Sequence, residues 1–134
     1  MKDPVIHQPS NLWGAQLIGM DTTIGAFCDI GNDVMIGTGC KIQCHVSIPP
    51  LTRIGNNVFI GPGVKITNDK HMDGNLKGVV IENGAKIGAG AIILADIGEN
   101  AIIGAGAIIL KPVEANTTVV GGIDYSQQVI DRRK

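Results

Sequence analysis

The sequence predicts an all-β fold, a parallel β-solenoid built from six-residue units. Isoleucine or leucine stands at every sixth position over half of the chain: Ile6, Leu12, Ile18, Ile24, Ile30, Ile36, Ile42, Ile48, Ile54, Ile60 and Ile66. Six is a multiple of two, so side chains at this spacing leave a strand on one face. On a helix of 3.6 residues per turn they would spiral around the axis. The repeat therefore favours short strands joined by tight corners.

Two further positions of the repeat support this prediction. Glycine often follows the aliphatic residue, as at Gly19, Gly25, Gly31, Gly37, Gly55 and Gly61. The fourth residue after the aliphatic is small or β-branched, with Gln16 as the exception: Ser10, Thr22, Cys28, Val34, Cys40, Val46, Thr52, Val58 and Val64. A large inward residue that alternates with a small one suits a narrow tube. The same pairs return as Ile81/Ala85, Ile87/Ala91, Ile97/Ala101, Ile103/Ala107 and Ile109/Val113.

Composition indicates one domain and excludes two kinds of partner. The chain has 134 residues and a formal net charge of −1. Acids and bases are interspersed, which argues against nucleic-acid binding. No segment approaches the roughly 20 apolar residues of a membrane span, and residues 1–10 lack the apolar run of a signal peptide. We expect a cytoplasmic protein without a membrane partner, with a solenoid over residues 1–122 and a tail or short helix over 123–134.

The repeat breaks at two places. Ile81 stands fifteen positions after Ile66, and the segment between them is polar and punctuated by glycine. It is predicted to be a loop over residues 68–80 that protrudes from the solenoid wall, a common place for functional residues. At the second break, Ile97 stands only four positions after Ile93. One corner of that coil must be tighter than the others.

The three cysteines do not form a metal or disulfide pattern. Cys28 and Cys40 stand at the small inward position of their hexads and are predicted to be core residues. Cys44 lies at a corner of an irregular hexad and is expected to be exposed. No metal site is predicted.

The hexad pattern resembles that of the hexapeptide-repeat acyltransferases, whose motif is an aliphatic residue, Gly, two free positions, a small residue and a free position. The resemblance covers residues 5–122. It implies a left-handed parallel β-helix in which three hexads form one triangular coil. Within it, "GPGVKITNDK" (residues 61–70) is similar to the nucleotide-linked aminosugar N-acetyltransferases. Residues 70–73, "KHMD", are similar to the His-x-x-Asp of galactoside and maltose O-acetyltransferases, in which this histidine is the general base.

The resemblance implies a set of site residues at the repeat break. His71 would be the catalytic base, since a histidine titrates near neutral pH and can take a proton from an attacking amine or hydroxyl. Asn68, Asp69 and Lys70 would contact substrate, and Asp73 could orient His71. Without the resemblance, all of these read as solvated loop residues.

His45 would be a further substrate contact. It stands where the aminosugar enzymes commonly have asparagine in a "KIQNNVS"-like stretch, while this chain has "KIQCHVS". It is equally compatible with an exposed corner residue. Either His45 or His71 could serve as the base.

Two near-copies resemble the acetyl-CoA wall of the family: residues 87–94 and 103–110 both read "IGAGAIIL". The resemblance implies that the pantetheine arm of acetyl-CoA lies along Gly88, Ala89, Gly104 and Ala105, with Lys111 near a phosphate. Without the resemblance, these residues would be tight solenoid corners only.

The function implied is transfer of an acyl group from acyl-CoA, most simply acetyl transfer to the amine of a nucleotide-linked aminosugar. The family's members are homotrimers with sites between subunits. One alternative is O-acetylation of a sugar or serine hydroxyl. Another, of a different class, is a non-catalytic scaffold subunit. A γ-class carbonic anhydrase shares the fold, but its paired zinc histidines do not match the wide spacing of His7, His45 and His71.

Overall fold

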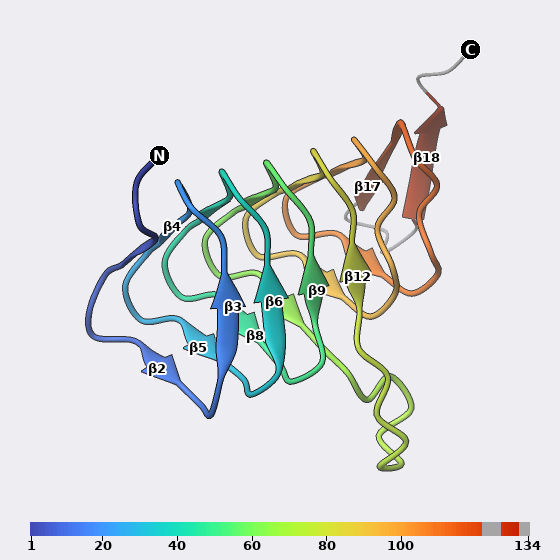
Figure 1. Cartoon of the computed structure of the whole chain (residues 1–134). Coiled ribbons are helices and arrows are strands. Elements are labelled where there is room, and N and C mark those ends of the chain that lie inside the picture. Colours follow the sequence, from blue (N-terminus) through green and yellow to red (C-terminus); the bar gives the residue numbers. More distant parts are fainter. Residues whose placement is uncertain (122–126, 132–134) are drawn as a thin grey trace.

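The computed structural model describes residues 1–121 and 127–131, and confirms the predicted parallel β-solenoid. Successive coils stack along one axis (Figure 1). The strands form three sheets. Sheet A contains β1 (Val5–Ile6), β4 (Thr23–Ile24), β7 (Lys41–Ile42), β10 (Phe59–Ile60), β13 (Lys86–Ile87), β15 (Ile102–Ile103), β17 (Thr117–Gly121) and β18 (Gln127–Asp131). Sheet B contains β2 (Asn11–Leu12), β5 (Asp29–Ile30), β8 (Ser47–Ile48), β11 (Lys65–Ile66), β14 (Ile92–Ile93) and β16 (Ile108–Ile109). Sheet C contains β3 (Gln16–Ile18), β6 (Val34–Ile36), β9 (Arg53–Ile54) and β12 (Val80–Ile81).

The hexad aliphatics fill the interior of the tube. From Ile24 to Ile109 each of them is buried. Small inward residues fit between these layers, and the hydroxyl of Thr22 donates to the carbonyl of Gly37 at 2.7 Å. Gln16, the exception to the small-residue rule, donates through Nε2 to the carbonyl of Gly31 at 3.0 Å. The interior is thus aliphatic, and these two polar side chains are paired with backbone carbonyls.

The cysteines lie as predicted. Cys28 and Cys40 are buried and Cys44 is exposed, and all three are free thiols. Burial raises the pKa of the Cys28 and Cys40 thiols above the ordinary value of a cysteine. They serve as small core residues.

Sheets A and B meet at one row of stacked corners, which we call the A–B edge (residues 25–28, 43–46, 61–64, 88–91 and 104–107). The third residue of each corner has positive φ: Phe27, His45, Gly63, Gly90 and Gly106. Its N–H donates to the previous coil, as from Gly90 to the carbonyl of Pro62 at 2.9 Å. These bonds tie the corners into a continuous ladder along the axis.

The length of a coil changes along the chain. Phe59 pairs with Lys41 eighteen positions earlier, but with Lys86 twenty-seven positions later. Lys86 in turn pairs with Ile102, only sixteen positions on. The extra residues form the loop between β11 and β12. The later coils are shorter because their corners between sheets B and C have fewer residues. We call this row of corners the B–C edge (residues 31–33, 49–52, 67–79, 94–96 and 110–112).

The tight corner predicted after Ile93 is confirmed, and it occurs twice. Ile97 and Val113, each four positions after the last residue of a sheet B strand, continue sheet C as single bridges, Ile81 to Ile97 and Ile97 to Val113. The second short corner was not predicted. Both lie on the B–C edge, directly after the coil that carries the loop.

The C-terminal segment differs from expectation. Residues 123–134 were expected to form a tail or a short helix, but Gln127–Asp131 form strand β18, antiparallel to β17. The β-branched pair Val129 and Ile130 favours a strand, and the free edge of β17 offers unpaired backbone groups. Residues 123–126 and 132–134 lie outside the described residues.

Candidate active site

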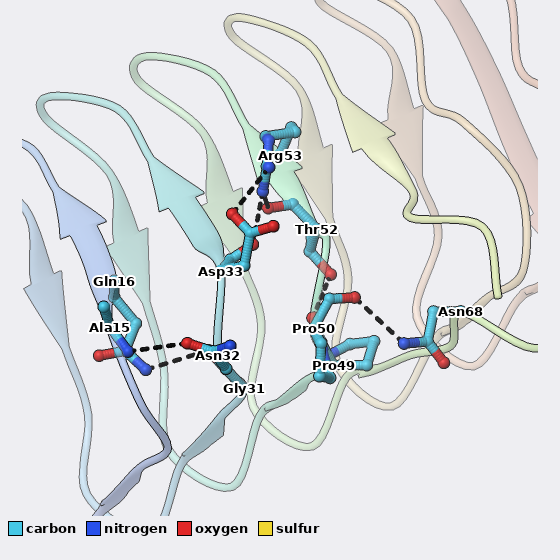
Figure 2. Close-up of polar contacts among 10 residues, drawn as sticks. All are labelled: Ala15, Gln16, Gly31, Asn32, Asp33, Pro49, Pro50, Thr52, Arg53 and Asn68. Carbon is cyan, nitrogen blue, oxygen red and sulfur yellow. Dashed lines mark hydrogen bonds and ion pairs between the residues drawn. The ribbon is translucent and has the colours of Figure 1, made fainter.

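The predicted loop protrudes from the B–C edge, between β11 and β12 (Figure 1). Its neck is tied to the solenoid. Asn68 donates through Nδ2 to the carbonyl of Pro50 at 3.1 Å, and its own carbonyl accepts the N–H of Lys77 at 2.7 Å. Figure 2 shows the first of these contacts beside the Pro49–Pro50 corner. A Cβ on Gly78 would lie 2.0 Å from the carbonyl oxygen of Leu51, so the chain leaves the loop in direct contact with the preceding coil.

Inside the loop, Asp69 organises the backbone. Its Oδ1 accepts the N–H of Asp73 and its Oδ2 that of Gly74, both at 3.0 Å. Its carbonyl accepts the N–H of Met72 at 3.1 Å. These bonds close a ring around residue 71. Asp69, predicted as a substrate contact, has both carboxylate oxygens engaged within the loop.

The imidazole of His71 is exposed on this ring. The carboxylate of Asp73 lies near it but accepts a hydrogen bond from the N–H of Asn75, at 3.0 Å. Hydrogen bonds from Asn75, together with the nearby positive charge of His71, lower the pKa of Asp73 below its ordinary value. Among the described contacts, the link between Asp73 and His71 is electrostatic and not a hydrogen bond.

The loop overhangs the two short corners and encloses a cavity of about 290 Å³. The cavity walls come from the loop and from the shortened coils: Lys70, His71, Lys77, Gly78, Val79, Leu94, Ala95, Asp96 and Pro112. Lys70 spans the cavity, since its Nζ donates to the carbonyl of Leu110 forty residues away. The two short corners thus supply one wall of the cavity that His71 and Lys70 face from the loop.

The remaining predicted site residues, apart from Lys111, lie on the A–B edge. A Cβ on Gly88 would come within 2.5 Å of the backbone nitrogen of Ala105, so the Gly-Ala corners stack without room for larger residues. The N–H groups of Ala89 and Ala105 are not used in the hydrogen bonds of the described residues. Gly90 and Gly106 face open space, because a Cβ added to either would have no atom within 4 Å. This edge therefore offers free backbone donors to an extended ligand.

His45 lies on the same A–B edge, in the third coil from the N-terminus. Its backbone has a φ of 60°, and its ring stacks on that of Phe27 with centroids 5.0 Å apart. Phe27 was not among the predicted site residues. Only the register of eighteen residues per coil brings the two rings together.

The structure thus divides the predicted residues between two edges of the prism. Asn68, Asp69, Lys70 and His71 lie on the B–C edge, and Lys111 follows Leu110 there. His45 and the corners at 88–89 and 104–105 lie on the A–B edge, with sheet B between the two rows. In one chain, His71 and the Gly-Ala corners do not face a common site. The cavity floor at residues 94–96 and 112 was missed, although the short corner at 93–97 pointed to it.

Metal ligands and membrane-spanning helices are not found in the described part of the chain. Within residues 1–121 and 127–131, no three histidine, cysteine, aspartate or glutamate side chains cluster as metal ligands. The same residues contain no helix long and apolar enough to cross a membrane.

The coil geometry and the six-residue pattern define the fold as a parallel β-helix of hexapeptide repeats. Residues 17–50 match the family model described as bacterial transferase hexapeptide (six repeats), so this part of the chain carries the repeat of these transferases, in agreement with the resemblance drawn from the sequence. The sequence comparison with curated proteins gives no match.

Solved structures share the fold. The acetyltransferase domain of PglB from Neisseria gonorrhoeae FA1090 has 20% identity and a TM-score of 0.78, over 88% of this chain and 54% of that one. WeeI from Acinetobacter baumannii AYE has 26% identity and a TM-score of 0.74, over 96% and 55%. AntD, an N-acyltransferase from Bacillus cereus in complex with dTDP and 3-hydroxybutyryl-CoA, has 18% identity and a TM-score of 0.78, over 99% and 81%. The chain spans about half the length of the first two.

Proposed function

We propose that the protein is an acyl-CoA-dependent acyltransferase that acetylates the amine of a nucleotide-linked aminosugar. The observation that carries this proposal is the A–B edge, where the N–H groups of Ala89 and Ala105 are free and Gly90 and Gly106 leave open space. An extended amide-rich chain such as pantetheine can lie against such an edge and pair with its backbone donors. The exposed loop histidine supplies a base.

Structures of similar fold support the same chemistry. The PglB domain has been solved in complex with acetyl coenzyme A. The H141A mutant of GDP-perosamine N-acetyltransferase from Caulobacter crescentus has been solved with CoA and GDP-perosamine, and it has 17% identity and a TM-score of 0.60. AntD carries an acyl-CoA and dTDP. An acyl-CoA donor and a nucleotide-linked amine are thus the substrates we expect.

The reaction needs one base and one oxyanion donor from this chain. The amine nitrogen attacks the thioester carbonyl, and His71 accepts the proton that the nitrogen loses. A free backbone N–H of the A–B edge stabilises the negative charge that develops on the carbonyl oxygen. As the C–S bond breaks, the thiolate of CoA leaves and takes up a proton. Lys111 is proposed to meet a phosphate of CoA.

A site that contains both edges requires more than one subunit. His71 and the Gly-Ala corners lie on different edges of one prism, so the loop of one subunit would face the A–B edge of a neighbour. A homotrimer around a threefold axis satisfies this arrangement for all three sites at once. We place the protein in the cytoplasm, where acetyl-CoA is available and free thiols such as Cys44 stay reduced.

The test is release of the CoA thiol on a panel of nucleotide-linked aminosugars, with acetyl-, formyl- and longer acyl donors. His71→Gln should lower turnover about 10²–10⁴-fold, the usual contribution of a general base. Met72→Gln is the matched control: it changes the neighbouring exposed loop residue and should leave turnover within a few-fold of the parent. Full turnover in His71→Gln would remove this residue from the mechanism.

The same panel separates the alternative functions. Acetylation of a hydroxyl, either on a sugar that lacks the amine or on the side chain of serine, would identify an O-acetyltransferase. A scaffold protein would show neither turnover nor protection by acetyl-CoA in a thermal melt. A ligand at 100 times its Kd should add about 2.7 kcal/mol to the free energy of unfolding, so a missing stabilisation would be easy to detect in the melt.

A further inference from the structure

Two exposed aromatic rings stack on the A–B edge, at positions that disfavour them. Phe27 and His45 have φ values of 62° and 60°, in the left-handed region. Glycine holds the same corner position in the next coils, at Gly63, Gly90 and Gly106. Positive φ recurs at corners throughout the solenoid, so the conformation belongs to the coil, but glycine, asparagine and aspartate adopt it more readily than a bulky aromatic side chain does. The rings lie 5.0 Å apart at an interplanar angle of 19°, and Phe27 is 58% exposed.

A hollow of about 200 Å³ adjoins the stack on the N-terminal side. Phe27 forms part of its wall, together with Pro9, Ser10, Asn11 and Asp29. The wall is therefore aromatic at one place and carries hydrogen-bonding groups at others. A flat heterocycle with polar edges fits this combination, because its face can stack on Phe27 while its edge meets an amide or carboxylate.

On the other side of the stack lies an ammonium group that has no carboxylate partner among the residues that the structure describes. Lys65 reaches back from β11, and its Nζ donates to the carbonyl of His45 at 2.7 Å. The ion pair of the described residues is Arg53 with Asp33, on another edge, so no carboxylate there neutralises Lys65. Its two remaining N–H donors are available to an anion. Coils are about 4.8 Å apart, so this charge sits roughly one coil beyond Phe27.

We propose that this part of the A–B edge binds a nucleoside phosphate, with the base in the hollow against the face of Phe27 that His45 leaves open, and a phosphate at Lys65. The site deepens the proposed function, since it rests on a nucleotide being part of a substrate. Two sources share the chemistry: the nucleotide of the aminosugar and the adenosine of CoA. An aromatic ring can stack on any nucleobase, so the binding of different nucleotides must be compared to decide between these two sources.

The chain carries its own reporter. Trp13 is the one tryptophan of the sequence, and its Nε1 donates to Oδ1 of Asp29 at 2.7 Å. Asp29 lines the hollow, so a bound base should change the fluorescence of Trp13. Equilibrium dialysis of dTDP, UDP, GDP and 3′,5′-ADP gives the affinity independently, with ribose 5-phosphate as the probe that lacks a base. Neither measurement requires acyl transfer.

The variants separate stacking from folding. Phe27→Asn removes the ring and places at this corner a residue that tolerates positive φ, so the fold is retained. Loss of stacking should weaken nucleotide binding about 5- to 150-fold. Lys65→Met should weaken binding and reduce its dependence on salt. Leu17→Ala, which truncates an exposed apolar residue on sheet C, is the control and should bind like the parent.

Each outcome decides the proposal. Binding of dTDP, UDP or GDP that falls in both Phe27→Asn and Lys65→Met supports the site and assigns it to the sugar nucleotide. The same result with 3′,5′-ADP alone supports it and assigns it to CoA. Absence of millimolar or tighter binding by every nucleotide overturns it, as does binding that both variants retain. Nucleotide binding without any acyl transfer would uphold this site while the proposed function failed.

Discussion

Gly78→Ala introduces a methyl carbon where the loop leaves the solenoid and no space exists for it. The added Cβ would lie 2.0 Å from the carbonyl oxygen of Leu51 and 2.6 Å from its carbonyl carbon, while real Cβ atoms essentially never come within 3.0 Å. Both neighbours are backbone atoms, so they cannot rotate away. The neck must therefore move by about 1 Å, which disturbs the adjoining hydrogen bond from Lys77 to Asn68.

The displacement predicts two magnitudes. Overpacking of this kind costs about 1–3 kcal/mol in the free energy of unfolding. If His71 is the base, a shift of about 1 Å at the reacting centre should lower kcat/KM about 100-fold. Urea unfolding measures the first value, and the thiol-release assay with the best acceptor measures the second.

Gly74→Ala is the matched control at the tip of the same loop. Gly74 has a φ of 83° but no atom within 4 Å of the added carbon, so this variant suffers backbone strain without a clash. The strain can relax within the exposed tip. Gly78→Ala should therefore lose more stability in urea than Gly74→Ala. Parent-like stability and activity in Gly78→Ala, or equal losses in the two variants, would refute the reasoning.

Three further predictions concern the core, the thiols and the loop. Ile87→Ala should lower the free energy of unfolding by about 2–5 kcal/mol, because it empties a fully buried layer, whereas Ile108→Ala, 44% exposed, should cost well under half of that in the same urea titration. One thiol, Cys44, should react with a disulfide reagent in the native protein, and all three should react in urea. Because burial raises the pKa of the other two thiols, their contribution to the free energy of unfolding should be constant from neutral pH up to about pH 8.5 and decline as the pH rises further, since the unfolded thiols ionise first. Asp69→Ala should speed hydrogen exchange at the amides of residues 73 and 74, because its carboxylate accepts both, while the exchange of core strands stays unchanged. Equal protection of these two amides in the variant would show that Asp69 does not hold the loop backbone.

The fold could be predicted because the signal is local and repeated. Each hexad carries its own inward aliphatic, so every strand from Ile6 to Ile66 is independent evidence for the same unit. The loop and the tight corner after Ile93 were visible for a related reason: each changes the spacing between inward residues. The strand β18 was not predicted, because its pairing depends on a free edge that exists only once the solenoid ends.

The site could be predicted only in part because its contacts run between coils. Lys70 meets the carbonyl of Leu110 forty residues away, and Phe27 meets His45 eighteen residues away. Such contacts follow from the register, which depends on the lengths of all the coils between them. The sequence indicated which residues are unusual but not which edge each occupies. The separation of His71 from the Gly-Ala corners was expected only through the family resemblance, which implied sites between subunits, and not from the residues themselves.

The coil lengths also govern how this scaffold can change over time. Each strand pairs with the strand one full coil earlier, so an insertion or deletion within a strand would shift the pairing register of every later coil. Here each departure from eighteen residues is absorbed on the B–C edge, as added chain in one turn and as lost chain in the next two. The B–C edge therefore tolerates changes in chain length. Insertions and deletions there can alter the residues that contact a ligand while the strands of the solenoid keep their register.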